Sequence, residues 1–298
     1  MVFDGLAIFS LGWYNKDMMK QMKTDLHTHT KFSPDGKDDI ETMLAAAEKQ
    51  GVSIYGISEH IDYDMRFQGI CVYEKPFFTD EEAYFRAARE KQKEFAGRVK
   101  VLVGAEFGYE DGEAVAKAYR NFYQKYKPDF IINSVHTVKG KDYCNGKPYR
   151  TENGQIRPKS EVYGEYFALI KRSVEAEYYY DIVGHLGYCA RYAPYEDKSA
   201  SYEEFPEEWD SVLKAVVERD KILEVNSSNK QGVSPTLPNR DILERYYALG
   251  GRKISFGSDA HFKERIADKR EFVLSMLKGI GFTVLTVPDG GKRIEVEI

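Results

Sequence analysis

Residues 25–36 read Asp25-Leu26-His27-Thr28-His29-Thr30-Lys31-Phe32-Ser33-Pro34-Asp35-Gly36, and the rest of the chain is organised around this stretch. If it forms a short strand running into a turn, His27 and His29 point to the same side, because side chains alternate along a strand. The residues from Ser33 to Gly36 are typical of a loop, which can bring the Asp35 carboxylate back over the two imidazoles. The stretch therefore predicts half of a metal site.

The positions of the other histidines favour a metal site over a chance pair. Two histidines spaced two residues apart are, on their own, more often an accidental feature of a strand. The chain contains six histidines, and the remaining four each follow a short apolar run. These four are His60 after residues 52–58, His136 after 130–135, His185 after 181–184 and His261 after 254–259.

Composition indicates an ordinary soluble protein without nucleic-acid or membrane partners. The 298 residues are 42% hydrophobic and 31% charged, which is enough to bury one large core. The formal net charge of −5 provides no basic field for nucleic acid. Cys71, Cys144 and Cys189 are widely spaced, which fits a reducing cytoplasm and excludes a thiolate-rich zinc site. Any metal must then be held by nitrogen and oxygen.

Residues 1–21 need a separate interpretation. The apolar stretch 6–14 is too short to span a membrane, and neither lysine nor arginine precedes it. It does not resemble a signal peptide. These residues are either an extension or an arm that packs across the fold; we favour an N-terminal extension before a single domain of residues 22–298.

From Met22 onward, short apolar segments alternate with amphipathic ones. The run 99–105 is almost continuously apolar, as in a strand buried on both faces. After the strand near Asp25, strands are expected at 52–58, 99–105, 130–135, 181–184, 222–226 and 253–257. Helices are expected at 38–50, 80–96, 113–126, 161–178, 206–219, 239–249 and 263–278. Residues 139–159 and 187–202 carry no clear period, and 282–298 has the pattern of a hairpin around Pro288-Asp289-Gly290-Gly291.

This alternation predicts an α/β fold with seven parallel strands, which suits a distorted (β/α)7 barrel better than an open sheet. In such barrels the active site collects at the C-terminal ends of the strands. The 222–226 strand offers no histidine there. The candidate ligands expected at the other strand ends are Asp35, His60, Glu106, His136, His185, Asp259 and His261.

The two later carboxylates have ordinary structural alternatives. Glu106 after a buried strand is commonly an ion-pair member or a helix-cap partner, and Asp259 can cap a following helix. However, Asp259 and His261 repeat the spacing of His27 and His29. A carboxylate that bridges two cations also allows several positive charges to share one pocket.

Together these motifs resemble the polymerase-and-histidinol-phosphatase superfamily, and within it the histidinol-phosphatase family. The superfamily resemblance rests on 25–30 with Asp35-Gly36, Ile57-Ser58-Glu59-His60, Gly104-Ala105-Glu106, Asn133-Ser134-Val135-His136, Gly184-His185-Leu186 and Gly257-Ser258-Asp259-Ala260-His261. The narrower resemblance rests on Glu224-Val225-Asn226-Ser227-Ser228, Ala190-Arg191-Tyr192 and Tyr247-Ala248-Leu249-Gly250-Gly251. The resemblance as a whole extends from about Met22 to Phe282, and residues 1–21 have no counterpart in the family pattern.

The resemblance implies a distorted seven-stranded barrel that binds about two to three divalent transition-metal ions. By motif position, the ligand sets are His27, His29, Glu106 and Asp259; Glu106, His136 and His185; and Asp35, His60 and His261. Imidazole with carboxylate suits zinc, iron or manganese alike. Some superfamily members have a histidine at the position of Asp35.

The implied reaction is hydrolysis of a phosphate monoester, because divalent ions both offset the phosphate dianion and activate water. We expect Glu106, Asp259 and His261 near the reacting atoms. An arginine fork should hold the phosphate, with Arg191 as first candidate ahead of Arg157 and Arg66; a solvated surface position is the alternative for each. Aromatic and charged residues of 143–157 and 188–195 should line the pocket.

The resemblance makes L-histidinol phosphate the expected substrate, in histidine biosynthesis. One alternative is a phosphoesterase of the same superfamily that acts on a nucleotide or another small phosphate ester. The other is a non-catalytic, metal-stabilised domain, which the complete set of ligand positions disfavours.

Overall fold

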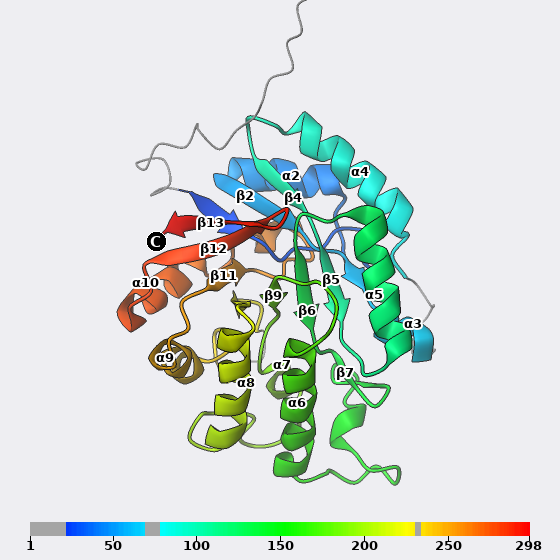
Figure 1. The fold of residues 1–298 in the computed structure, drawn as a ribbon, viewed down its shortest axis with the longest axis vertical. Coiled ribbons are helices and arrows are strands. Elements are labelled where there is room, and N and C mark those ends of the chain that lie inside the picture. Colours follow the sequence, from blue (N-terminus) through cyan, green and yellow to red (C-terminus); the bar gives the residue numbers. More distant parts are fainter. Residues whose placement is uncertain (1–21, 69–77, 230–233) are drawn as a thin grey trace, which may run out of the picture.

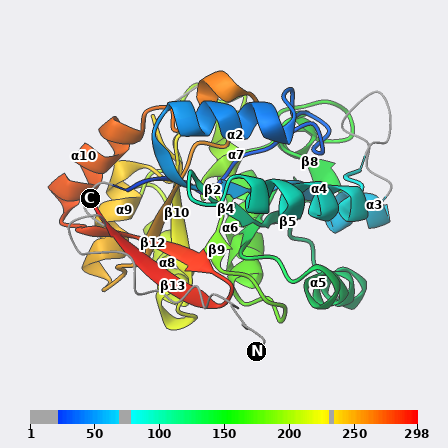
Figure 2. The same cartoon turned by 90° about the horizontal axis from the view of Figure 1, so that it is seen from above.

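The structure is a computed structural model that describes residues 22–68, 78–229 and 234–298. Strands occupy the middle of the molecule and helices lie around them, as two perpendicular views show (Figures 1 and 2). The expectations for residues 1–21 and for Cys71 fall outside the described residues.

The parallel strands belong to two sheets. One has the order β1-β2-β4 and the other the order β11-β10-β9-β6-β5-β3. These strands are β1 (Lys23–Asp25), β2 (Val52–Ile57), β3 (His60–Ile61), β4 (Lys100–Val103), β5 (Ala105–Gly108), β6 (Ile131–Ser134), β9 (Ile182–Val183), β10 (Ile222–Asn226) and β11 (Ile254–Gly257). The predicted α/β architecture with parallel strands is therefore confirmed.

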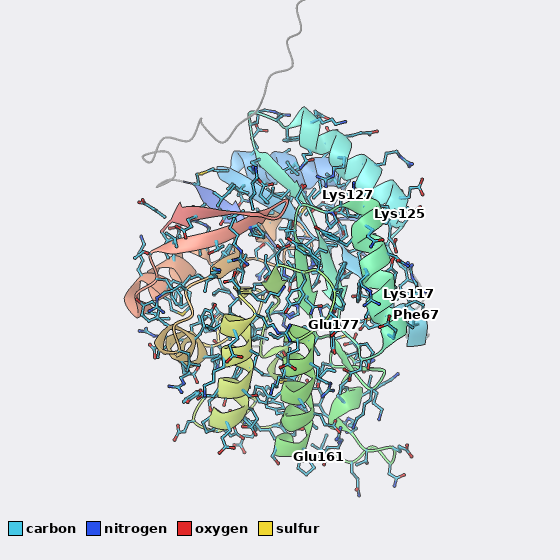
Figure 3. The ribbon with its side chains drawn as sticks, in the orientation of Figure 1. Phe67, Lys117, Lys125, Lys127, Glu161 and Glu177 are labelled. Carbon is cyan, nitrogen blue, oxygen red and sulfur yellow. The ribbon has the colours of Figure 1, made fainter. Side chains whose placement is uncertain are left out.

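Helices follow the strands along the chain. They are α2 (Ile40–Lys49), α3 (Tyr63–Gln68), α4 (Glu81–Glu94), α5 (Glu113–Tyr126), α6 (Lys159–Val174), α7 (Tyr188–Arg191), α8 (Pro206–Glu218), α9 (Arg240–Ala248) and α10 (Arg270–Ile280). The amphipathic pattern of α5 illustrates their packing: Tyr119 and Phe122 are buried, whereas Lys117 and Lys125 point away from the strands (Figure 3). In the part of the chain that the structure describes, no helix is both long and apolar enough for a bilayer.

The strand predicted at 99–105 is instead two strands in two sheets. β4 pairs with β2, and after Gly104 the chain continues as β5, which pairs with β3 and β6. A Cβ atom at Gly104 would lie 2.4 Å from the Phe130 ring. Only glycine allows the backbone to come this close to the aromatic ring, and at this residue the chain passes from one sheet to the other.

The helix predicted at 263–278 begins later than expected. A short 3₁₀ turn, η2 (Lys263–Arg265), comes first, and α10 starts only at Arg270. Between them Ala267 and Lys269 have positive φ angles, which a continuous helix excludes. The Ala267 N–H donates to the buried Asp25 carboxylate over 2.7 Å, so a tertiary hydrogen bond overrides the local helical pattern.

The two segments without periodicity contain short elements, and the C-terminal hairpin is confirmed. Residues 139–159 include β8 (Lys141–Asp142), which pairs with β7 (Thr137–Val138), and the 3₁₀ turn η1 (Lys147–Tyr149). Residues 187–202 include α7. At the C-terminus, β12 (Val284–Asp289) and β13 (Lys292–Glu297) form an antiparallel pair around Gly290-Gly291.

Backbone contacts also link the first and last parallel segments. The Leu26 N–H donates to the Phe256 carbonyl at 3.1 Å, and the Asp259 N–H donates to the His27 carbonyl at 2.7 Å. Thr28 forms a parallel bridge with Ala260. The two i, i+2 motifs, far apart in sequence, thus lie side by side.

Candidate metal centre

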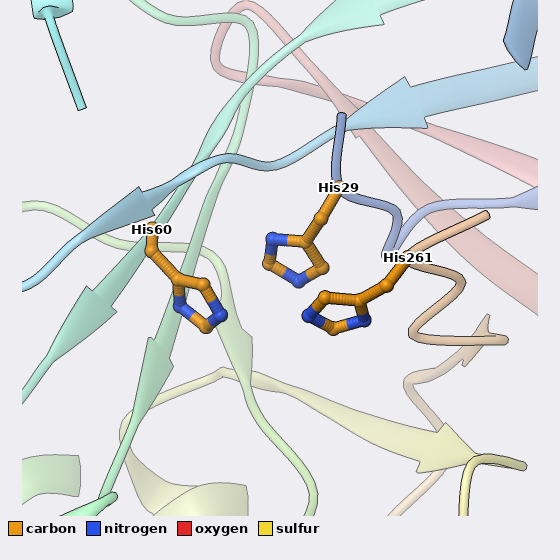
Figure 4. Close-up of side chains that lie close together, drawn as sticks. All are labelled: His29, His60 and His261. Atoms are coloured by element: carbon orange, nitrogen blue, oxygen red, sulfur yellow. The ribbon is translucent and has the colours of Figure 1, made fainter. Parts of the chain in front are cut away.

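Parallel pairing brings the predicted ligands together at one edge of the strands. All parallel strands present their C-terminal ends in the same direction, so residues just past those ends converge. His27 and His29 follow β1, His60 begins β3, Glu106 lies in β5, His136 follows β6, His185 follows β9, and Asp259 and His261 follow β11. Figure 4 shows His29, His60 and His261 with their rings close to one another.

The first group surrounds a point between β1, β5 and β11. The Nε2 atom of His27 lies 3.3 Å from Glu106 Oε2, and the Nε2 atom of His29 lies 3.6 Å from the same oxygen. Asp259 Oδ1 lies 3.8 Å from His27 Nε2 and 3.4 Å from His29 Nε2. Ligand atoms about 2.1 Å from a tetrahedral ion lie about 3.4 Å apart, so these separations fit a single cation.

The second group uses the other oxygen of Glu106. Oε1 lies 3.2 Å from His136 Nε2 and 2.9 Å from His185 Nε2, and the two imidazole nitrogens are 3.3 Å apart. The Ser134 hydroxyl also donates to Oε1 at 2.7 Å. Glu106 therefore faces both groups, one oxygen to each.

The third group lies at the more exposed side. His261 Nε2 lies 2.9 Å from Asp35 Oδ2, and His60 Nε2 lies 3.8 Å from Asp35 Oδ1. The rings of His60 and His261 each stack on His29, with centroids 4.2 and 4.3 Å away. The structure thus brings together all nine residues predicted as metal ligands.

Unpartnered buried atoms show that the cluster fits a metal ion. Among the described residues, Nε2 of His27, His29 and His261, together with Oε2 of Glu106, are buried without a hydrogen-bond partner. Buried polar atoms are normally satisfied, and here several unsatisfied ones face the same space. Nitrogen and oxygen donors in this arrangement match a divalent transition metal.

Hydrogen bonds on the far side of the imidazoles fix which nitrogen faces the cluster. His27 Nδ1 lies 2.6 Å from Glu224 Oε1, and His261 Nδ1 lies 2.9 Å from the Asp259 carbonyl oxygen. Both oxygens accept, so Nδ1 carries a proton, and the neutral imidazole then has its lone pair on Nε2. His29 Nδ1 meets the Ser33 hydroxyl, whose own proton goes to the Glu59 carboxylate, with the same result.

Neighbouring carboxylates outweigh burial and raise the pKa of four imidazoles, those of His27, His60, His136 and His261. Burial favours the protonated form of Glu106, but the surrounding imidazoles of His27, His136 and His60 hold its pKa well below the usual range. Burial lowers the pKa of His29 to about 3, with help from His60 and His261, so this imidazole is neutral. A buried carboxylate anion needs positive charge beside it, which either protonated imidazoles or cations can supply.

Of the three candidate arginines, only Arg191 lies at the cluster. Its Nη1 atom is 3.6 Å from Asp259 Oδ2, and its Nη2 donates to the Ser228 hydroxyl at 2.5 Å. The Arg191 side chain is buried and its Nε has no hydrogen-bond partner among the described residues. The guanidinium also lies over the Tyr188 ring, 5.0 Å from its centroid.

Arg157 and Arg66 are engaged elsewhere. Arg157 pairs with Glu165 and Glu161, and Glu161 lies at the start of α6 on the outside of the molecule (Figure 3). Arg66 is exposed, pairs with Glu81 and stacks on Tyr63. Neither contact involves a residue of the metal cluster.

Part of the predicted pocket lining also lies elsewhere. The Tyr188 ring packs against His136 and His185, with centroids 5.3 and 5.0 Å away. In contrast, Tyr143 is fully buried and packs edge-on against Tyr149 and Tyr166 in the core.

Sequence reasoning did not propose two carboxylates that belong to the cluster. Asp62 lies 3.7 Å from both His60 Nδ1 and His136 Nδ1, and these three residues form another set with metal-ligand spacing. The i, i+2 spacing of Asp62 from His60 could have identified Asp62 as a candidate ligand from the sequence. Glu224 contacts His27, and its presence within the apolar strand β10 was the other signal, because a glutamate is almost never buried unless paired.

Comparison with known proteins places this fold and cluster in one family. The model of the PHP domain family matches residues 25–228, and the chain belongs to that family. The chain is 34% identical over 247 residues to a probable histidinol-phosphatase of Clostridium acetobutylicum, covering 82% of this chain and 89% of the relative. It is 27% identical over 270 residues to a histidinol-phosphatase of Lactococcus lactis, covering 91% and 96%.

Solved structures of histidinol phosphatases share the fold of this chain. Histidinol phosphate phosphatase from L. lactis, in complex with zinc, L-histidinol and phosphate, superposes with a TM-score of 0.79 at 27% identity, covering 91% of this chain and 98% of that one. A histidinol phosphatase structure from Listeria monocytogenes, described as putative, shares the fold, with a TM-score of 0.72 at 24% identity over 84% of this chain and 99% of that one.

Proposed function

We propose that this protein is a metal-dependent phosphatase that hydrolyses L-histidinol phosphate to L-histidinol and phosphate, a reaction of histidine biosynthesis. The single observation that carries the proposal is the buried cluster in which Glu106 faces two groups of imidazoles, with Arg191 beside Asp259. The histidinol-phosphatases at 27% and 34% identity, which match most of the chain, support the choice of substrate.

The ligand sets we propose follow the three groups of the cluster. They are His27, His29, Glu106 and Asp259; Glu106, His136 and His185; and Asp35, His60 and His261. The unpartnered buried Nε2 atoms support this assignment. We propose about two to three ions, of zinc, iron or manganese, and the zinc in the L. lactis structure favours zinc.

Divalent ions held by these residues would offset the charge of the phosphate dianion and would supply an activated water as the nucleophile. The protein's own side chains position the substrate. Arg191 is placed to hold two phosphate oxygens with its fork, and Tyr188 beneath it limits the motion of the guanidinium. Asp259 and His261 lie on the same side of the cluster as Arg191, and we propose that this places both residues next to the reacting atoms.

The proposal also covers the type of barrel, the domain bounds and the cellular location. Contacts from Leu26 to Phe256 and from Thr28 to Ala260 support a distorted seven-stranded barrel closed between the first and last parallel segments. A hydrophobic core that runs from Met22 to Val296 supports one domain over residues 22–298, preceded by the 1–21 extension. Cysteine usage supports a cytoplasmic location.

The test is a phosphate-release panel on metal-loaded protein. It compares L-histidinol phosphate with nucleotides, sugar phosphates and an aryl phosphate, and we expect the highest kcat/KM for L-histidinol phosphate. If a nucleotide gives the highest value, the substrate assignment is wrong and a phosphoesterase of the same family remains. If metal-loaded protein releases no phosphate from any compound, the catalytic proposal fails as a whole.

A further inference from the structure

We propose that Glu224 is a positioning residue that holds two of the metal groups in register, by orienting the His27 ring and the backbone at His185. This inference rests on the metal positions of the proposed function. Glu224 is not one of the proposed ligands. It projects from β10, the parallel strand whose sequence offers no histidine.

Each oxygen of Glu224 contacts a different group. Oε1 accepts from His27 Nδ1 at 2.6 Å, and Oε2 accepts from the His185 backbone N–H at 2.6 Å. In the ligand sets proposed above, His27 belongs to the first group and His185 to the second, and their ligand atoms lie within 4.8 Å of each other and of Glu106. Glu224 is thus a second link between the groups, on the side of the imidazoles opposite to Glu106.

The surrounding backbone is shaped to admit this carboxylate. Gly257 of β11 lies beside it, and a Cβ atom there would be 2.2 Å from Glu224 Oε1 and 2.6 Å from His27 Cβ. Any larger residue at position 257 would displace Glu224 or the His27 ring. Because Glu224 is itself buried, its two short hydrogen bonds are the means by which its charge is satisfied.

The contact decides how well His27 can bind a cation. With Nδ1–H donated to the carboxylate, Nε2 keeps the lone pair that faces Glu106 and Asp259. A glutamine at position 224 has only one oxygen. If that oxygen keeps the His185 N–H, the amide NH₂ faces His27 Nδ1 and forces the imidazole proton onto Nε2, where it blocks coordination.

The experiment compares Glu224→Gln and Glu224→Ala with the wild type and with Asp181→Asn. Asp181 is a matched control, because its buried carboxylate also accepts two hydrogen bonds, from the Ile131 N–H and the Tyr179 hydroxyl, at the other end of β9. Circular dichroism checks folding. The readouts are metal content, the rate of metal transfer to a chelator, and the visible absorption bands of the Co²⁺-loaded protein.

We expect both Glu224 variants to bind metal about 10- to 100-fold more weakly, which is the usual cost of losing an outer-shell partner. Their Co²⁺ bands should shift, while Asp181→Asn keeps wild-type bands and exchange rates. The inference is overturned if folded Glu224→Gln retains its metals at the wild-type rate with an unchanged Co²⁺ spectrum. If Glu224→Ala does not fold, Glu224→Gln alone decides.

The outcome does not depend on the substrate. A wild-type protein that binds metal but leaves L-histidinol phosphate intact would contradict the proposed function only. A Glu224→Gln protein with wild-type metal retention would contradict this inference only.

Discussion

Glu106 is the residue on which the geometry of the cluster converges. It is fully buried, and each of its oxygens lies about as far from two imidazole nitrogens as ligands of one ion lie from each other. A side chain in this position contributes both charge and spacing. Changing its charge without its size should therefore separate these contributions.

Glu106→Gln is expected to lose bound metal and activity together. The amide keeps the volume but removes the anion that faces both groups. Loss of an outer-shell partner alone costs about 10- to 100-fold, so we expect kcat/KM to fall by more than about 100-fold. Metal analysis and steady-state kinetics on the same preparation test this. An unchanged metal content would show that Glu106 is not a ligand.

Arg191→Ala is expected to lower kcat/KM for L-histidinol phosphate by at least about tenfold, which corresponds to ~1.4 kcal/mol of transition-state stabilisation. The reason is the loss of the only candidate arginine fork that lies beside Asp259. Arg157→Ala is the matched control, because Arg157 pairs with Glu161 and Glu165 away from the cluster. A larger effect at Arg157 than at Arg191 would move the phosphate clamp to that side of the molecule.

At the scale of elements, local sequence signals worked where no tertiary contact competed with them. The α2 helix, expected at 38–50, spans Ile40–Lys49, and the Asp39 side chain caps it by accepting from the Thr42 N–H at 2.8 Å. Helix α5 spans Glu113–Tyr126 as expected, and strand β10 spans Ile222–Asn226. The start of α10 was mispredicted because Asp25, distant in sequence, captures the Ala267 N–H.

Asp39→Ala is expected to lower the free energy of unfolding by about 1 kcal/mol, the usual cost of removing a helix N-cap. Asp39→Ser keeps a capping oxygen and should recover most of this loss. The hydrogen bond from the Thr42 backbone N–H lowers the pKa of Asp39 in the folded protein. The stabilisation of the fold by this cap is therefore fully present above the unfolded-state pKa of about 3.9. It disappears as the pH falls through the folded-state pKa. Urea titrations at neutral and acidic pH measure both effects. Equal stability of Asp39→Ala and wild type at pH 7 would contradict the capping role.

At the scale of the whole molecule, the metal cluster connects strands from both sheets. His27 follows β1 in one sheet, whereas Glu106 and His185 come from the other. Ions held between them would bind the folded state and not the unfolded chain. Such binding stabilises a protein by an amount that grows with metal concentration relative to Kd.

Chelation is expected to inactivate the enzyme and lower its thermal midpoint together. Removing a ligand present at about 100 times its Kd costs about 2.7 kcal/mol of stability. Metal analysis of fresh protein should find about two to three equivalents, and adding back zinc, manganese or iron should restore both properties. If freshly prepared protein is active with only trace metal, a metal-dependent mechanism is excluded.

The sequence by itself determined the alternation of strands and helices and the choice of candidate ligands. Periodicity and caps are local properties, and metal ligands are restricted to a few residue types, so both can be read along the chain. The positions of the other four histidines made His27 and His29 candidate ligands, and the repeated i, i+2 spacing did so for Asp259 and His261.

Only the tertiary structure decided how these residues meet. It placed Glu106 between two groups, placed Arg191 at the cluster and Arg157 and Arg66 away from it, and revealed Asp62 and Glu224. It also divided the 99–105 strand at Gly104, where the Phe130 ring leaves no space for a side chain. These outcomes depend on distances between residues far apart in sequence, which the pairing of strands sets and no local pattern encodes.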